Sequence, residues 1–238
     1  MSSMHRRGKL MFLTLAAAVL VTAGGVLVYP VLRTLPRSSR VVEWIRHPEE
    51  HPTWAIRAGE RCGDAPFQFP TSGYIGFVWG DSFRPFHRHS GIDIFGGSAP
   101  GLTPVMAVSD GYVTRLAEWK ASLILRIPSD PLQPERQIWV YYTHLADPQG
   151  QSLIDEAFPP GIEEKFVQVG TLLGWQGNYS GRADAPVGVH LHISVVKDDG
   201  RGKFLDERRI ENTLDPSPYF GLDLKATQWK QDPFMCQN

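Results

Sequence analysis

Four histidines and one aspartate occur in short apolar segments, in a pattern that could bind a metal ion. The segments are HSGID, YYTHL and HLH, and they contain His89, Asp93, His144, His190 and His192. Side chains two or four residues apart on a strand share a face. An extended SGIDIF segment would therefore point His89 and Asp93 the same way, and the two histidines of HLH would also share a face. The sequence thus predicts two polar faces that converge on one point.

Imidazole and carboxylate groups are the usual ligands of zinc, and a catalytic zinc site takes three protein ligands and leaves a fourth position to water. His89, Asp93 and one histidine of HLH would form such a set, and spacing does not tell which of the two it is. The remaining two histidines would serve as proton acceptor and oxyanion stabiliser. A lone HxH or HxxxD is a weak signal, so the prediction depends on the three segments occurring together. His5, His47 and His51 are expected to be incidental.

Short apolar runs separated by glycine position these residues. From residue 73 onwards the runs are YIGFVWG, GIDIFGG, TPVMAVSDGYVTRL, SLILRI, QIWVYYTHL, FVQVGTLLGWQGN and VGVHLHISVV. Strands joined by tight turns are typical of this texture, so an all-β fold is predicted. Residues 128–136 and 147–165 are expected to be loops, and the second is long enough to border a cleft.

The chain of 238 residues has room for one catalytic domain and a targeting segment. We divide it into a cytoplasmic N-terminus with a membrane anchor (1–33), a linker with one short helix (34–72), the catalytic domain (73–221) and a C-terminal tail (222–238). The 24 Lys and Arg residues nearly balance the 25 Asp and Glu residues, which argues against a nucleic-acid partner.

An uncharged run, LMFLTLAAAVLVTAGGVLVYPVL, covers residues 10–32. About 20 such residues suffice for a transmembrane helix. Basic residues before the run favour a cytoplasmic N-terminus and an exported domain, although arginines also follow it. The alternative is a signal peptide cleaved after Val21-Thr22-Ala23, which would release the protein. We favour the anchor because the apolar run continues well beyond that site.

Two cysteines, Cys62 and Cys236, lie far apart and form no CxxC motif, so a metal-thiolate site is excluded. In an oxidising compartment the pair is expected to form one disulfide. In the cytosol both would be free thiols.

The motifs HSGIDI, TPVMAVSDGYV, YYTHL, VQVGTLLGWQGN and VHLHISV, in this order, resemble the lysostaphin-type zinc endopeptidases, also called the LytM domain family. The resemblance extends from about Gly73 to about Gly221. It implies an antiparallel β-sheet core with a substrate groove, one bound zinc ion, and hydrolysis of peptide bonds in the stems or cross-bridges of bacterial peptidoglycan. The expected partners are therefore cell-wall peptides and, through the anchor, the membrane.

By motif position, the resemblance implies that His89, Asp93 and His192 bind zinc and that His144 and His190 form the catalytic pair. His87 does not fit the HxxxD spacing and is expected at the rim of the site.

Parts of the sequence are also compatible with three other functions. The first is an inactive LytM-type domain that binds the cell wall or activates another hydrolase; relatives of that kind usually lack a ligand, whereas all five positions are filled here. The second is a biotinyl or lipoyl carrier, which needs a lysine at its hairpin tip that FVQVGTLLGWQGN lacks. The third is a zinc carboxypeptidase, which needs a glutamate shortly before the last ligand, where the sequence reads VGVH.

Overall fold

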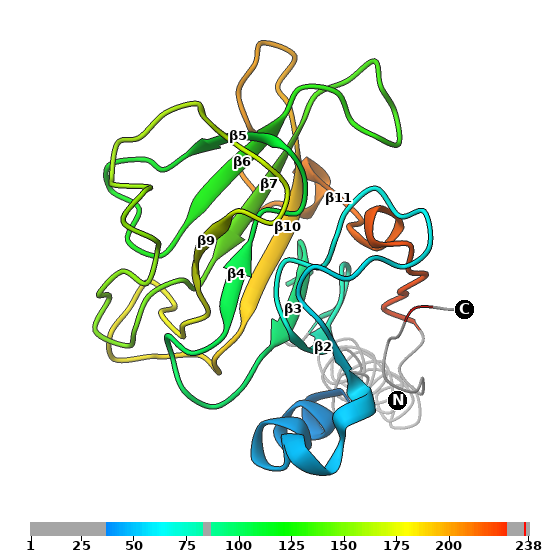
Figure 1. The fold of residues 1–238 in the computed structure, drawn as a ribbon, viewed down its shortest axis with the longest axis vertical. Helices are drawn as coiled ribbons and strands as arrows, with labels where there is room; N and C mark the ends of the chain where they lie inside the picture. Colours follow the sequence, from blue (N-terminus) through cyan, green and yellow to red (C-terminus); the bar gives the residue numbers. More distant parts are fainter. Residues whose placement is uncertain (1–36, 83–86, 228–235, 237–238) are drawn as a thin grey trace, which may run out of the picture.

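The computed structural model describes residues 37–82, 87–227 and 236 (Figure 1). The apolar run predicted to span the membrane lies outside these residues. Within the described part of the chain, no helix is both long and apolar enough to cross a bilayer. The regular structure is mostly antiparallel β-sheet, which confirms the β part of the predicted fold class.

One large antiparallel sheet carries the site. In the described residues it has nine strands in the order β1-β2-β3-β10-β7-β6-β5-β8, with β11 paired to β10, while β4 and β9 form a second sheet. Each apolar run predicted to be extended contains at least one strand. The strands are β1 (Ala55–Ile56), β2 (Gly73–Phe77), β3 (Ile92–Phe95), β4 (Pro104–Met106), β5 (Gly111–Thr114), β6 (Leu123–Ile127), β7 (Ile138–Thr143), β8 (Lys165–Val167), β9 (Leu172–Trp175), β10 (Leu191–Lys197) and β11 (Thr213–Leu214). The described part of the chain also contains four short 3-10 helices, η1 (Pro48–Glu50), η2 (Pro52–Trp54), η3 (Ile210–Asn212) and η4 (Ser217–Phe220).

The alternation of side chains along β10 separates the core from the site. Leu191, Ile193 and Val195 are buried in the main hydrophobic core, as the HLH pattern predicts. His192 and Ser194 point to the opposite face of the sheet. Because β10 lies between β3 and β7, the side chains on this face meet those of both neighbours.

Part of the predicted linker, residues 34–72, packs against the large sheet. Residues 37–46 are helical, and Val41 and Trp44 are buried against Tyr74 of β2 and Phe95 of β3. The Trp44 indole N–H donates to the Phe95 carbonyl at 2.7 Å. The short helix is thus present, but apolar contacts attach it to the sheet.

A buried ion pair also attaches this helix to the turn after β2. Arg37 donates to the Asp81 carboxylate, and both side chains are almost fully buried. The same carboxylate accepts the backbone N–H of Val78 at 2.8 Å. This turn packs directly beside His89, whose backbone N–H donates to the Asp81 carbonyl at 2.7 Å.

A disulfide joins Cys62 to Cys236, as expected for an oxidising compartment. The residues it connects are 174 apart in sequence, so the chain-entropy estimate of its contribution is about 5 kcal/mol. Leu222 and Leu224 also pack in the main core. The described part of the C-terminal tail therefore belongs to the folded domain.

Replacement of Gly91 by Ala should destabilise the contact between the segment before β3 and β10. A Cβ at this position would collide with the Ile193 carbonyl oxygen and would lie 2.8 Å from the Ser194 hydroxyl. We expect a loss of about 2 kcal/mol in the free energy of unfolding, measured by denaturant titration. Gly188→Ala is the matched control, because its nearest neighbour would be an ordinary 3.4 Å contact with Phe95. Equal stability of the two variants would contradict the close approach.

Replacement of Arg37 by Met should leave Asp81 buried without its cation. Breaking a buried ion pair in this way typically costs about 3 kcal/mol. Arg46→Met, on the exposed side of the same helix, should change the unfolding free energy by less than about 0.5 kcal/mol. If both variants unfold at the same denaturant concentration, the ion pair does not anchor the helix.

Candidate metal centre

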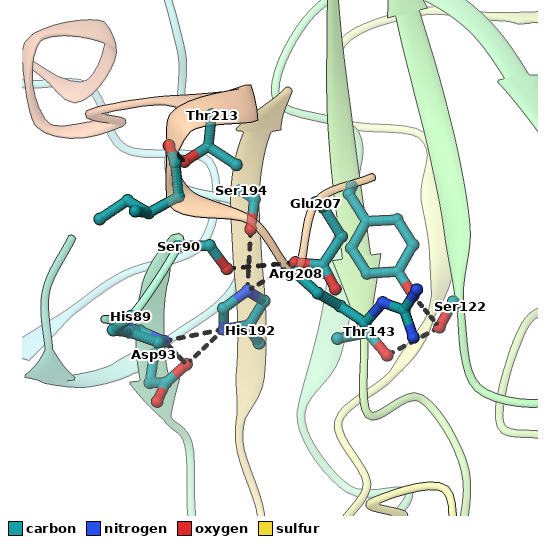
Figure 2. A network of polar contacts seen from close by, with 12 residues as sticks. His89, Ser90, Asp93, Ser122, Thr143, His192, Ser194, Glu207, Arg208 and Thr213 are labelled. Atoms are coloured by element: carbon teal, nitrogen blue, oxygen red, sulfur yellow. Dashed lines mark hydrogen bonds and ion pairs between the residues drawn. The ribbon is translucent and has the colours of Figure 1, made fainter. Parts of the chain in front are cut away.

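The side chains of His89, Asp93 and His192 converge on one face of the sheet, as Figure 2 shows. His89 Nε2 lies 3.0 Å from Asp93 Oδ1 and 2.9 Å from His192 Nδ1, and His192 Nδ1 lies 2.8 Å from Asp93 Oδ1. All three residues are buried. The register of β3 and β10 places Asp93 and His192 directly opposite each other, and His89 reaches them from the turn before β3.

The second ring nitrogens of the two histidines have partners of their own. His89 Nδ1 donates to the Val78 carbonyl at 3.0 Å, which leaves Nε2 without a proton in the neutral ring. His192 Nε2 lies 2.8 Å from the Ser194 hydroxyl, so its Nδ1 is free to bind a metal when Nε2 carries the proton. Three lone pairs then face one point, an arrangement that only a cation or a shared proton can stabilise.

The electrostatics of the site agree with this geometry. Burial alone would raise the pKa of Asp93, but the imidazole of His89, followed by the other histidines, holds it well below its usual range. Burial would lower the pKa of His192, but the carboxylates of Asp93 and Glu207 raise it to about 10 in the metal-free protein. Without a metal, the His192 imidazolium therefore forms an ion pair with the Asp93 carboxylate.

The donor set fits zinc. Two imidazole nitrogens and one carboxylate oxygen, all within 4.8 Å of one another, are the three protein ligands of a typical catalytic zinc site, which leaves a position for water. The structure thus groups His192, and not His190, with the other two proposed ligands.

The proposed catalytic pair lies beside this group. The ring centroids of His144 and His190 are 4.4 Å apart, and His190 Nε2 is 3.6 Å from Asp93 Oδ1. His144 Nδ1 donates to the Tyr179 carbonyl at 2.7 Å and His190 Nδ1 to the Gly188 carbonyl at 2.6 Å. Because a carbonyl only accepts, each neutral ring has its unprotonated Nε2 available as a proton acceptor.

Burial, followed by the proximity of His190, lowers the pKa of His144 to about 3, and burial also lowers the pKa of His190. Both rings are therefore neutral at pH 7 in the metal-free protein. His144 also has a φ of 71°, in the left-handed region that non-glycine residues seldom adopt. Strained backbone of this kind is concentrated at functional sites.

All five residues line a cleft of about 870 Å³, and His87 also lies on its lining, as expected for a rim residue. The loop 147–165, expected to border a cleft, contributes no lining residue here. The walls come instead from residues 118–122, 179–181 and 207–208, together with Val187. Of the other histidines, His47 and His51 lie outside the cleft lining, and His5 lies outside the described residues.

The sequence did not predict that Glu207 belongs to this site. Its carboxylate lines the cleft and lies 3.8 Å from His192 Nε2. It belongs to the polar stretch after β10, where neither periodicity nor motif spacing relates it to the histidines.

No family model matches the sequence, and no curated protein matches it. Among solved structures, the chain is similar to a putative M23 peptidase from Pseudomonas aeruginosa (18% identity, 76% of this chain and 61% of that chain, TM-score 0.39). It is also similar to Helicobacter pylori Csd3 (19% identity, 65% of this chain and 34% of that chain, TM-score 0.38) and to lysostaphin (18% identity, 69% and 53%, TM-score 0.35). The chain thus spans about a third of Csd3 and less than two thirds of the M23 protein. These are distant similarities to M23 and LytM-type peptidases, and the function is argued from the site itself.

Proposed function

We propose that this protein is a zinc-dependent metalloendopeptidase that hydrolyses peptide bonds in bacterial peptidoglycan during cell-wall remodelling. The observation that carries the proposal is the group of three buried ligand atoms, within 4.8 Å of one another, in a cleft shared with two further histidines. The class of substrate is supported by the order of the motifs, which resembles that of lysostaphin-type enzymes.

Zinc held by His89, Asp93 and His192 would polarise the scissile carbonyl and make a water molecule more acidic. His144 and His190 keep Nε2 unprotonated because their Nδ1 atoms donate to backbone carbonyls. Either ring can therefore accept a proton from the attacking water, and in its protonated form it can stabilise the developing oxyanion or protonate the leaving amine. The carbonyls of Tyr179 and Gly188 fix the orientation of the two rings.

Variants of the five residues separate ligands from catalysts. Replacing His89, Asp93 or His192 by Ala should remove zinc and activity together, because three ligands are needed. Replacing His144 or His190 by Ala should leave zinc bound while hydrolysis of purified peptidoglycan falls by a factor of about 10² or more. Metal content and the masses of released fragments are measured in parallel.

His47→Ala, at an exposed histidine outside the cleft, is the control and should match the wild type in both measurements. If the wild-type protein binds no zinc, or if His144→Ala digests as well as wild type, the peptidase proposal fails. A protein that binds peptidoglycan without cleaving it would support the alternative of an inactive wall-binding or activating domain.

We further propose that the catalytic domain lies outside the cytoplasm, anchored by the apolar run 10–32, with release after signal-peptide cleavage as the alternative. The Cys62–Cys236 disulfide supports export, because such bonds persist in oxidising compartments. A reporter that folds only after export, fused behind residue 238, should be active and should remain in the membrane fraction. Activity in the soluble fraction would indicate release, and an inactive reporter would contradict export.

A further inference from the structure

A second carboxylate lies on the outer side of His192. Asp93 contacts Nδ1 of this ring at 2.8 Å, while Glu207 Oε2 lies 3.8 Å from Nε2 on the opposite edge. In Figure 2, His192 lies between these two acidic groups. The imidazole is thus placed between one carboxylate from β3 and another from the loop after β10.

Glu207 is held in this place by contacts inside the site. The Ser90 hydroxyl donates to Glu207 Oε2 at 3.2 Å, and Ser90 directly follows the proposed ligand His89. The Glu207 side chain is only 21% exposed. Its sequence neighbours Asp206 and Arg208 are more exposed and form an ion pair with each other at 2.8 Å.

The surroundings of the two histidine ligands differ in charge. His89 donates from its outer nitrogen to a neutral backbone carbonyl, that of Val78. The outer nitrogen of His192 lies 2.8 Å from the fully buried Ser194 hydroxyl, and the negatively charged Glu207 carboxylate lies 3.8 Å from the same nitrogen. A carboxylate near the outer N–H of a ligand histidine fixes the ring orientation and strengthens the inner nitrogen as a donor.

We propose that Glu207 is a positioning residue of the metal centre, which holds His192 with Nδ1 directed at the zinc ion and offsets part of the charge of that ion. This inference rests on the proposed zinc peptidase function. Glu207 would be a sixth residue of the site, and it belongs to the loop after β10, outside the motifs that resemble the LytM family. Ser90 and Ser194 act in the same network by fixing the carboxylate and the ring.

The test measures zinc affinity of the full-length protein by competition with a chromophoric chelator. Glu207→Gln, which removes the charge and keeps the shape, and Glu207→Ala should each bind zinc about 10- to 100-fold more weakly than wild type. Glu207→Asp, which restores the charge, should recover part of the affinity. Glu118→Gln is the matched control, because Glu118 lines the same cleft but is exposed; its zinc affinity should equal that of wild type.

Unfolding of the metal-free variants distinguishes positioning from a general structural role. Without zinc, Glu207→Gln and Glu207→Ala should be less stable than wild type, because Glu207 accepts from Ser90 and lies beside the His192 ring, whereas Glu118→Gln should match wild type. The stability gained on adding zinc should be smaller for Glu207→Gln and Glu207→Ala than for wild type. Zinc affinity within twofold of wild type for both variants would overturn the inference. So would an equal loss of stability with and without zinc. A wild-type protein that binds no zinc would instead overturn the proposed function, so the two failures are distinguishable.

Discussion

The site depends on one constraint: three ligand atoms, His89 Nε2, Asp93 Oδ1 and His192 Nδ1, are held within 3.0 Å of one another. Strand pairing imposes it, because the register of β3 and β10 sets Asp93 opposite His192. The lone pairs of these three atoms repel one another unless a cation or a shared proton lies among them. The energy of sheet pairing and core burial therefore maintains a geometry that is favourable only with a positive charge at its centre.

Much of the remaining structure stabilises the surroundings of that point. Leu191 and Ile193 anchor β10 in the core, so the face that carries His192 has a fixed direction. The Arg37–Asp81 pair attaches the N-terminal helix to the turn whose Val78 carbonyl accepts from His89. On another side, Phe95 stacks on His190 at 4.9 Å between ring centroids. Helix 37–46 thus contacts the turn that orients the proposed ligand His89. It also packs on Phe95, which stacks on the proposed catalytic residue His190.

The β-fold and the convergence of the histidine segments could be predicted because both depend on local signals. The alternation in HLHISV predicts which face of the strand is apolar, and the glycine-bounded runs predict where strands begin and end. Neither signal depends on residues distant in sequence. Spacing could not separate His190 from His192, since the distinction depends on where each ring lies relative to Asp93. The resemblance to LytM-type enzymes supplied that distinction, and in the structure Asp93 Oδ1 lies 2.8 Å from His192 and 3.6 Å from His190. Glu207, the packing of helix 37–46 and the Arg37–Asp81 pair depend on contacts between residues distant in sequence, for which no local pattern exists.

The most direct test of the account is the position of zinc in crystals of the metal-loaded protein, located by anomalous scattering at the zinc absorption edge. The account predicts a single strong peak about 2.0 to 2.2 Å from His89 Nε2, His192 Nδ1 and an Asp93 oxygen. His144 and His190 should lie near the peak without being ligands. A peak bound by His144 or His190 in place of His192, or no peak between the three proposed ligands, would contradict it.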